Sequence, residues 1–169
     1  MLEKKIKYNI HRVYELPFQI KTTVFQYKII HNILPTKVSL FKAKICDDDT
    51  CPQCLAGRHF LDHMFLRCQL SLSFWDLFQT WWTSKTKENL TLTENMILYG
   101  IFNNREHLYS LNYSLLVAKY SIYSSCLQEK KLCFDSYLTL LREKINIQRE
   151  IVVHNNKITK FKTIYRFLL

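Results

Sequence analysis

The chain has 169 residues, a formal net charge of +10, 48% hydrophobic residues and 14% aromatic residues. This length allows one core with a small metal-bound segment, and the apolar content is too high for a disordered tail. With only two glycines and three prolines, the chain has too few turn residues for a many-stranded barrel or sandwich. We therefore expect a mostly α-helical module.

The sequence contains no apolar run of the roughly 18 residues that a transmembrane helix needs. Its basic N-terminus lacks the apolar region and the cleavage site of a signal peptide. We therefore expect a protein that has no membrane partner, stays inside the cell in the cytoplasm or the nucleus, and is not secreted. In such a reducing compartment, the six cysteines indicate metal ligands and buried thiols more than disulfides.

Positive charge is concentrated at the two ends of the chain. Residues 1–44 carry nine basic and two acidic residues, residues 45–140 carry eight and ten, and residues 141–169 carry seven and two. Two basic ends around a nearly neutral middle indicate a polyanionic partner, most simply nucleic acid. The alternative is a solvated surface that keeps the protein soluble.

The expected elements start after an extended or loosely ordered lead-in of about twenty residues. Apolar periodicity predicts a helix over residues 21–32. Pro35 ends this helix, because the residue before a proline is pushed out of the α region. Thr36 can then cap a second, short helix that runs toward residue 45.

Further helices are expected on both sides of a polar loop that follows residue 82. The segment LSLSFWDLFQTWW, residues 70–82, predicts an amphipathic helix, and TLTENMILYGIF predicts a short one that begins near Thr93 or Thr91. The apolar stripe of the first helix is expected to contain Leu72, Trp75, Phe78 and Trp82.

Two long helices are predicted over residues 107–131 and 134–153, followed by a basic segment that forms a final helix or frays. The apolar face of the first long helix is expected to contain Leu111, Leu115, Ala118, Ile122 and Leu127. The chain thus divides into a basic N-terminal helical segment (1–45), a zinc knuckle with its following helix (46–84) and a C-terminal helical segment with a basic tail (85–169).

The stretch CPQCLAGRHFLDHMFLRC carries the most specific signal in the chain. Cys51 and Cys54 have the C-x2-C spacing of a knuckle turn, and His63 and Cys68 follow at spacings of x8 and x4. A Cys3His set suits tetrahedral Zn²⁺, and four protein ligands leave no position for water. We predict one structural zinc ion in a CCHC knuckle embedded in the helical module.

Two details of this cluster qualify the prediction. On a regular α-helix, residues five apart lie about 140° apart around the axis, so His63 and Cys68 need a frayed or bent turn, or a helix that starts between them. His59 is the alternative ligand, since it follows Cys54 at a short knuckle spacing, but nothing at Met64 completes that shorter pattern. Cys46, Cys126 and Cys133 are expected to be ordinary thiols.

On these residues, the chain resembles the C-terminal region of the polyproteins of LINE-type (non-LTR) retrotransposons, which ends in a reverse-transcriptase zinc-binding domain. The resemblance rests on VFQYKIIHNILPTKVSLFKAKI with its LPT turn, on C-x2-C-x8-H-x4-C followed by SFWDLF, and on LNYSLLVAKYSIYSSCL. Together these segments cover roughly residues 15–160. The family usually has Glu-Thr a few residues before the histidine, where this chain reads Arg58-His59.

The resemblance implies a module that handles nucleic acid beside a polymerase, helping it to engage template RNA or target DNA in target-primed reverse transcription. RNA is favoured over DNA, and the upstream reverse-transcriptase domain of the same polyprotein is a second expected partner. The alternative is an architectural or protein-interaction zinc module, as in a decayed or domesticated fragment, without direct nucleic-acid binding.

No catalytic residues are assigned, because the cysteines near histidines are spaced as metal ligands, and the sequence shows neither a phosphate-binding glycine-rich loop nor an obvious carboxylate pair. We therefore expect a protein that is not an enzyme. Basic side chains around the cluster are the candidates for phosphate contact. They are Lys37, Lys42 and Lys44 before the cluster and Arg58 and Arg67 within it.

Overall fold

The protein is described from a computed structural model, which covers residues 20–101, 107–154 and 158–168. Within these residues the regular elements are helices, and a single isolated β-bridge pairs Thr50 with Arg58. The mostly α-helical fold is confirmed. The helices are α2 (Ile20–Ile30), α3 (Lys37–Lys42), the π-helix η1 (His63–Arg67), α4 (Gln69–Thr86), α5 (Glu94–Tyr99), α6 (His107–Leu127), α7 (Phe134–His154) and α8 (Ile158–Tyr165).

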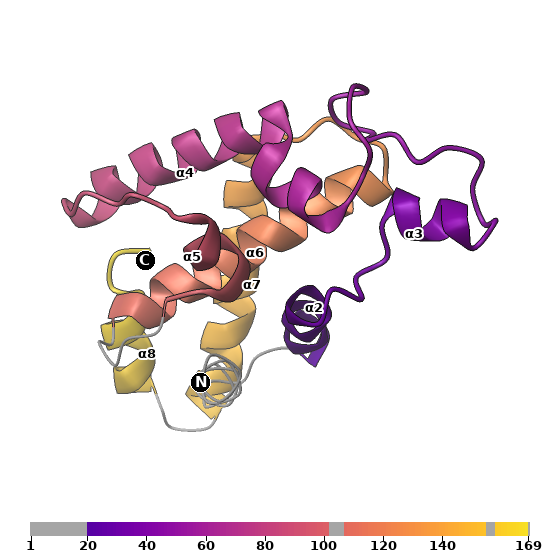
Figure 1. Ribbon diagram of the computed structural model, residues 1–169. Coiled ribbons are helices and arrows are strands. Elements are labelled where there is room, and N and C mark those ends of the chain that lie inside the picture. Colours follow the sequence, from indigo (N-terminus) through magenta and orange to yellow (C-terminus); the bar gives the residue numbers. More distant parts are fainter. Residues whose placement is uncertain (1–19, 102–106, 155–157, 169) are drawn as a thin grey trace, which may run out of the picture.

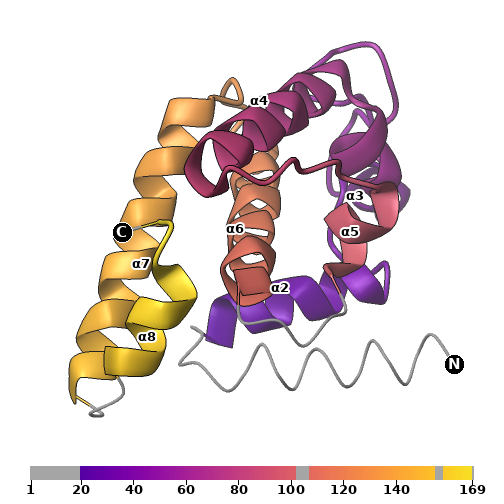
Figure 2. The ribbon, with the colours of Figure 1, turned by 90° about the vertical axis from the view of Figure 1, so that its left-hand side faces the viewer.

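Helix α6 lies at the centre of the bundle and contacts α2, η1, α7 and α8 (Figures 1 and 2). It is therefore buried around most of its circumference between Leu111 and Ile122, whereas the apolar periodicity predicted a single buried face. The predicted core residues Leu111, Leu115, Ala118 and Ile122 are buried. Leu127 was predicted wrongly: it is 56% exposed, because the helix ends there, beyond its packing partners.

The N-terminal helices begin and end close to where the sequence predicts. Thr36 caps α3 through a reciprocal pair of hydrogen bonds, in which its hydroxyl accepts the Ser39 N–H (3.3 Å) and Ser39 Oγ accepts the Thr36 N–H (2.9 Å). Such a cap stabilises a short helix by about 1 kcal/mol. Helix α3 ends at Lys42, earlier than expected, because Lys44 has a left-handed backbone (φ 57°).

Helix α4 carries an aromatic row into the core. Phe78 is fully buried, stacks on Trp82 and meets the ring of Trp75 edge to face. Leu72 was wrongly assigned to this row: it is 41% exposed, and Phe74 takes the core position, packed edge to face against Tyr137 of α7. The three tryptophans lie in or against the core, so aromatic packing, not base stacking, accounts for them.

The C-terminal helices pack on α6 and on each other. Helix α7 spans the predicted segment, and the final basic segment forms α8, whose Tyr165 donates a hydrogen bond to Gln148 Oε1 (2.5 Å). The predicted lead-in over the first residues lies outside the described part of the chain, and the three-part division of the chain stays a prediction. None of the described helices has the length and apolarity to cross a membrane.

Lys119 is a buried cation in the middle of α6, only 2% exposed. Its Nζ donates to Gln26 Oε1 (2.5 Å) on α2 and to the Leu98 carbonyl (3.1 Å) on α5, and Gln26 Nε2 donates to the same carbonyl (2.8 Å). Burial lowers the pKa of Lys119 from 10.5 to about 7. This network joins three helices through one side chain whose charge is costly to bury.

The buried amine predicts a specific pH dependence of stability. Between pH 7 and 10.5 the unfolded chain holds the Lys119 proton more tightly than the folded chain, whose pKa is about 7, so folding becomes more favourable as pH rises. The free energy of unfolding should increase by about 2 kcal/mol from pH 7 to pH 9 from this group alone. Urea titrations of wild type and Lys119→Met across this window measure the difference.

In Lys119→Met this contribution should be missing, while Gln26 Nε2 still satisfies the Leu98 carbonyl. Thiol titration affects both proteins alike and cancels in the comparison. Parallel stability curves for the two proteins would show that Lys119 keeps its ordinary pKa in the folded chain.

Candidate metal centre

The first two cysteines lie in a tight hairpin over residues 50–58. The Thr50–Arg58 bridge closes its base, the Cys51 N–H donates to the Gly57 carbonyl (2.7 Å), and the Leu55 N–H donates to the Cys51 carbonyl (2.9 Å). Leu55 turns the chain with a left-handed backbone (φ 55°). The C-x2-C spacing therefore forms a turn that places both sulfurs on the same side.

The other two candidate ligands stand at the two ends of a π-turn. The Cys68 N–H donates to the His63 carbonyl (2.7 Å), an i→i+5 bond that widens the helix over His63–Arg67. π-turns of this kind are rare and occur often at functional sites. The wider turn reduces the 140° offset that a regular α-helix would impose, so the predicted bend between His63 and Cys68 takes this form.

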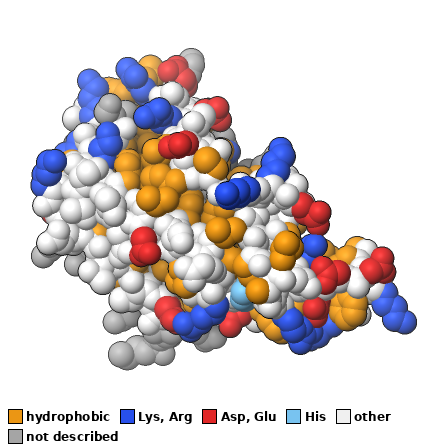
Figure 3. All heavy atoms as spheres, turned by 90° about the horizontal axis from the view of Figure 1, so that it is seen from above, with side chains coloured by type: hydrophobic (Ala, Val, Ile, Leu, Met, Phe, Trp, Pro, Cys, Tyr) orange, Lys and Arg blue, Asp and Glu red, His pale blue; other side chains and the backbone are white. Residues whose placement is uncertain are grey.

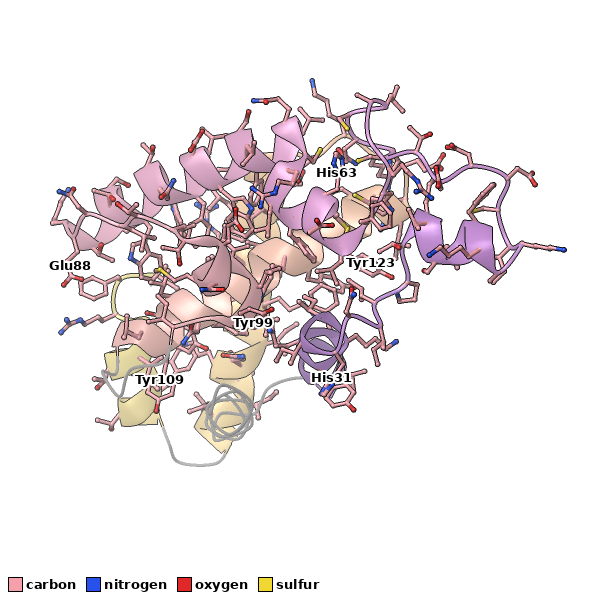
Figure 4. All side chains as sticks on the ribbon, viewed as in Figure 1. His31, His63, Glu88, Tyr99, Tyr109 and Tyr123 are labelled. Atoms are coloured by element: carbon pink, nitrogen blue, oxygen red, sulfur yellow. The ribbon has the colours of Figure 1, made fainter. Side chains whose placement is uncertain are left out.

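Together the two segments gather one possible ligand atom from each of Cys51, Cys54, His63 and Cys68, all within 4.8 Å of one another. Cys54 Sγ lies 3.3 Å from His63 Nε2, and Cys51 Sγ lies 4.0 Å from Cys68 Sγ. Figure 4 shows His63 with sulfur atoms beside it. Tetrahedral zinc with ordinary bond lengths separates two sulfurs by about 3.8 Å and a sulfur from a nitrogen by about 3.6 Å. The donor set therefore fits a four-coordinate zinc ion.

The electrostatics of the hairpin favour a thiolate at Cys54. Burial alone raises the pKa of Cys54, but hydrogen bonds from the backbone of Ala56 and Gly57, together with His63 and Cys51, lower it to about 6. Cys51 is fully buried, and burial raises its pKa to about 11, against backbone hydrogen bonds that lower it. A divalent cation would offset the cost of ionising the buried Cys51 thiol, since zinc binds thiolates and not thiols.

Gly57 leaves room for the imidazole. A Cβ atom at this position would lie 2.6 Å from His63 Cε1 and 3.0 Å from His63 Nδ1, closer than real Cβ atoms approach. The backbone of the hairpin therefore packs directly on the His63 ring and limits its rotation. Sequence reasoning did not single out this glycine, although its position between the cysteine pair and the histidine is a usable signal.

His59, the alternative ligand, points elsewhere. Its Nδ1 accepts the Lys37 N–H (3.0 Å), and its Nε2 is buried and has no hydrogen-bond partner among the described residues. Burial, with the neighbouring His63 and Lys37, lowers the pKa of His59 to about 4. A neutral His59 thus connects the hairpin to the start of α3 and takes no part in the cluster.

Cys126 is buried beyond the cluster, and burial raises its pKa to about 12.

Two side chains of α4 bond the carbonyls at the end of the π-turn. Ser71 Oγ donates to the Met64 carbonyl (2.6 Å), and Trp75 Nε1 donates to the Phe65 carbonyl (2.8 Å). Both donors are buried. A helix that stops at Cys68 leaves its last carbonyls without intrahelical partners, so these two bonds make the turn possible inside the core.

A second anchor ties the hairpin to the loop between α6 and α7. Gln53 Nε2 donates to the Lys130 carbonyl (2.7 Å), and Gln53 Oε1 accepts the Leu132 N–H (3.0 Å). Lys37 Nζ forms an ion pair with Glu129 (3.0 Å) beside this contact. Sequence reasoning missed Gln53, because nothing in its local pattern signals a partner nearly eighty residues away.

The five cations predicted to contact phosphate divide into two groups. Lys37 pairs with Glu129 and Asp48, Arg58 with Asp49 (2.6 Å) and Arg67 with Glu94 (2.7 Å). Lys42 and Lys44 are exposed and form no ion pair with the described residues. Figure 3 shows basic and acidic side chains close together at the end of the molecule that is formed by α3 and the following loop.

Comparison with known proteins agrees with this geometry. The model of a family described as zinc-binding in reverse transcriptase matches residues 2–75, which include all four residues of the cluster. This match confirms the resemblance to a reverse-transcriptase zinc-binding domain over that part of the chain, slightly less than half of it. No curated protein matches the chain. The match and the Cys3His composition together support one structural zinc ion.

The Trp75 indole predicts a stability effect that packing alone would not produce. Trp75→Phe keeps an aromatic ring but leaves the buried Phe65 carbonyl without its donor, and such a loss costs about 1–3 kcal/mol. Chemical denaturation of the zinc-loaded protein should show this decrease. Trp81→Phe is the matched control, because Trp81 is half-buried and no hydrogen bond is seen at its indole within the described residues. Equal losses in the two variants would contradict the role given to the Trp75 N–H.

Proposed function

We propose that this chain is a non-catalytic zinc-stabilised module that binds nucleic acid, and that it works as an accessory of a reverse transcriptase. The observation that carries the proposal is a Cys3His cluster of zinc-binding dimensions inside a segment that matches a reverse-transcriptase zinc-binding family. We assign Cys51, Cys54, His63 and Cys68 as the zinc ligands, in the CCHC order of a knuckle.

A structural role for the ion follows from the donor set. Four protein ligands fill a tetrahedral zinc shell, so no position remains for a reacting water or substrate. The ion would instead stabilise residues 50–68, which form a short hairpin and a single π-turn and no longer regular element. Binding free energy of this kind contributes directly to folding.

Nucleic acid is the partner that the charge supports best. The chain carries a net charge of +10, and phosphate contacts made by lysine and arginine supply most of the affinity of such modules. Among the five predicted cations, Lys42 and Lys44 at the end of α3 are the strongest candidates, since carboxylates already pair with the other three. Template RNA or target DNA in target-primed reverse transcription is the expected ligand, with RNA favoured.

The second candidate function is an architectural module that packs on the polymerase part of the same polyprotein. The ion pairs of Lys37, Arg58 and Arg67 favour it, because these side chains brace the fold instead of facing a free partner. A decayed or domesticated copy of a retroelement could keep this role alone. The two functions differ in whether the isolated chain binds polynucleotide.

Removal of a ligand should abolish zinc binding. Cys51→Ser and His63→Ala should each lower the zinc content of purified, reduced protein from about one ion per chain toward none, and loosen residues 46–70. Elemental analysis measures the metal, and amide hydrogen exchange measures the loosening. His59→Ala serves as the control and should keep its zinc. Full zinc content in both ligand variants would refute the assignment.

Salt dependence distinguishes the two candidate functions. If the zinc-loaded chain contacts three to five phosphates of a single-stranded RNA, the logarithm of its affinity should fall against the logarithm of salt concentration with a slope of about −2 to −3.5. Fluorescence anisotropy over a range of salt concentrations gives the slope. Absence of binding even at low salt would reject the nucleic-acid function and favour the architectural one.

A further inference from the structure

A cleft of about 410 Å³ lies between α7 and α8, away from the metal centre. Figure 2 shows α8 running beside the C-terminal part of α7, while α3 and the cysteine hairpin lie on the other side of the molecule in both ribbon views. The cleft is lined by Arg142, Ile145, Asn146, Arg149, Ile158, Phe161, Lys162 and Leu168.

The lining residues come from matched faces of the two helices. Arg142, Asn146 and Arg149 follow each other at intervals of four and three residues, so they share one face of α7. Arg142 and Arg149 are thus separated by about 10.5 Å along the helix. Lys162 faces them from α8. Three cations therefore surround one opening.

None of these three cations is neutralised from within the described chain. Arg142, Arg149 and Lys162 are exposed, form no ion pair with a described carboxylate, and share the cleft with no acidic residue. The nearest acids in sequence, Glu143 and Glu150, lie about 100° further round α7 from the two arginines. The cations next to the metal centre, in contrast, are mostly paired.

We propose that the α7–α8 cleft is a second binding site for single-stranded nucleic acid, with Arg142, Arg149 and Lys162 contacting successive phosphates. Arginine matches phosphate oxygens with its two-pronged guanidinium group, and the two-turn spacing suits separate phosphates along one strand. The partly exposed Ile158 and Leu168 provide apolar surface for a base beside the cationic rim. A single strand can enter a cleft of this size, whereas a duplex is too wide.

This inference rests on the proposed nucleic-acid function and extends it to a surface beyond residues 2–75. It gives a role to the basic C-terminal region, which carries seven basic and two acidic residues over residues 141–169, and in which Arg142, Arg149 and Lys162 form no ion pair with a described residue. The strand would touch the molecule at two places, near Lys42 and Lys44 and at the cleft.

The test compares charge-removing and charge-keeping variants of the whole zinc-loaded chain. Arg142→Gln/Arg149→Gln should weaken binding of a single-stranded RNA of about 20 nucleotides by roughly tenfold or more, and reduce the salt slope by about 1.4, which is two phosphates. Arg142→Lys/Arg149→Lys keeps both charges and should retain most of the slope. Circular dichroism checks that each variant keeps its helicity, as expected for exposed side chains.

The control Lys85→Gln/Lys87→Gln removes the same charge at the exposed end of α4, from residues that do not line the cleft, and should lower affinity only slightly. If wild type binds RNA and the double arginine variant binds with the same affinity and slope, the cleft proposal is overturned while the proposed function stands. If wild type binds no polynucleotide, the proposed function fails and the cleft site with it. Equal competition by polyglutamate would identify an acidic polypeptide site and also overturn the proposal.

Discussion

A four-coordinate metal ion requires that four donor atoms converge, and two of them belong to His63 and Cys68, which are five residues apart on one helical turn. The i→i+5 bond from the Cys68 N–H to the His63 carbonyl meets that requirement by widening the turn. The widened turn faces two ways, since Met64 and Phe65 are fully buried in the core while His63 turns to the sulfurs. The same five-residue turn therefore contributes His63 to the metal centre and Met64 and Phe65 to the hydrophobic core.

This arrangement places demands on the following helix. Carbonyls at the end of the π-turn need donors in a dry environment, and α4 supplies a hydroxyl from Ser71 and an indole N–H from Trp75. A phenylalanine would keep an aromatic ring at this position but offers no N–H donor. The tryptophan of SFWDLF is thus tied to the geometry of the ligands, and the matched family segment ends at this residue.

The sequence predicts the features that depend on residues a few positions apart. It does not predict those that depend on contacts between residues far apart in the chain. The Thr36 cap and the cysteine spacing are readable because the residues involved lie a few positions apart. Lys119 looks like a surface residue in an apolar helix, and its burial depends on Gln26 and the Leu98 carbonyl, which come from other helices. The type of turn between His63 and Cys68 could not be predicted from the sequence either. The spacing of the two ligands requires a bend but does not specify which backbone hydrogen bond forms it.

Net charge alone does not locate a nucleic-acid contact. Lys37, Arg58 and Arg67 lie beside the metal centre, yet each is held by a carboxylate, so a phosphate would have to displace an existing partner. Arg142 and Arg149 have no such partner among the described residues and share an opening with a third cation. Release of counterions from phosphate is favourable where the protein cation is not already neutralised. Under the proposed function, the unpaired cations of the α7–α8 cleft would therefore provide a larger driving force for binding a polyanion than the paired ones beside the metal centre.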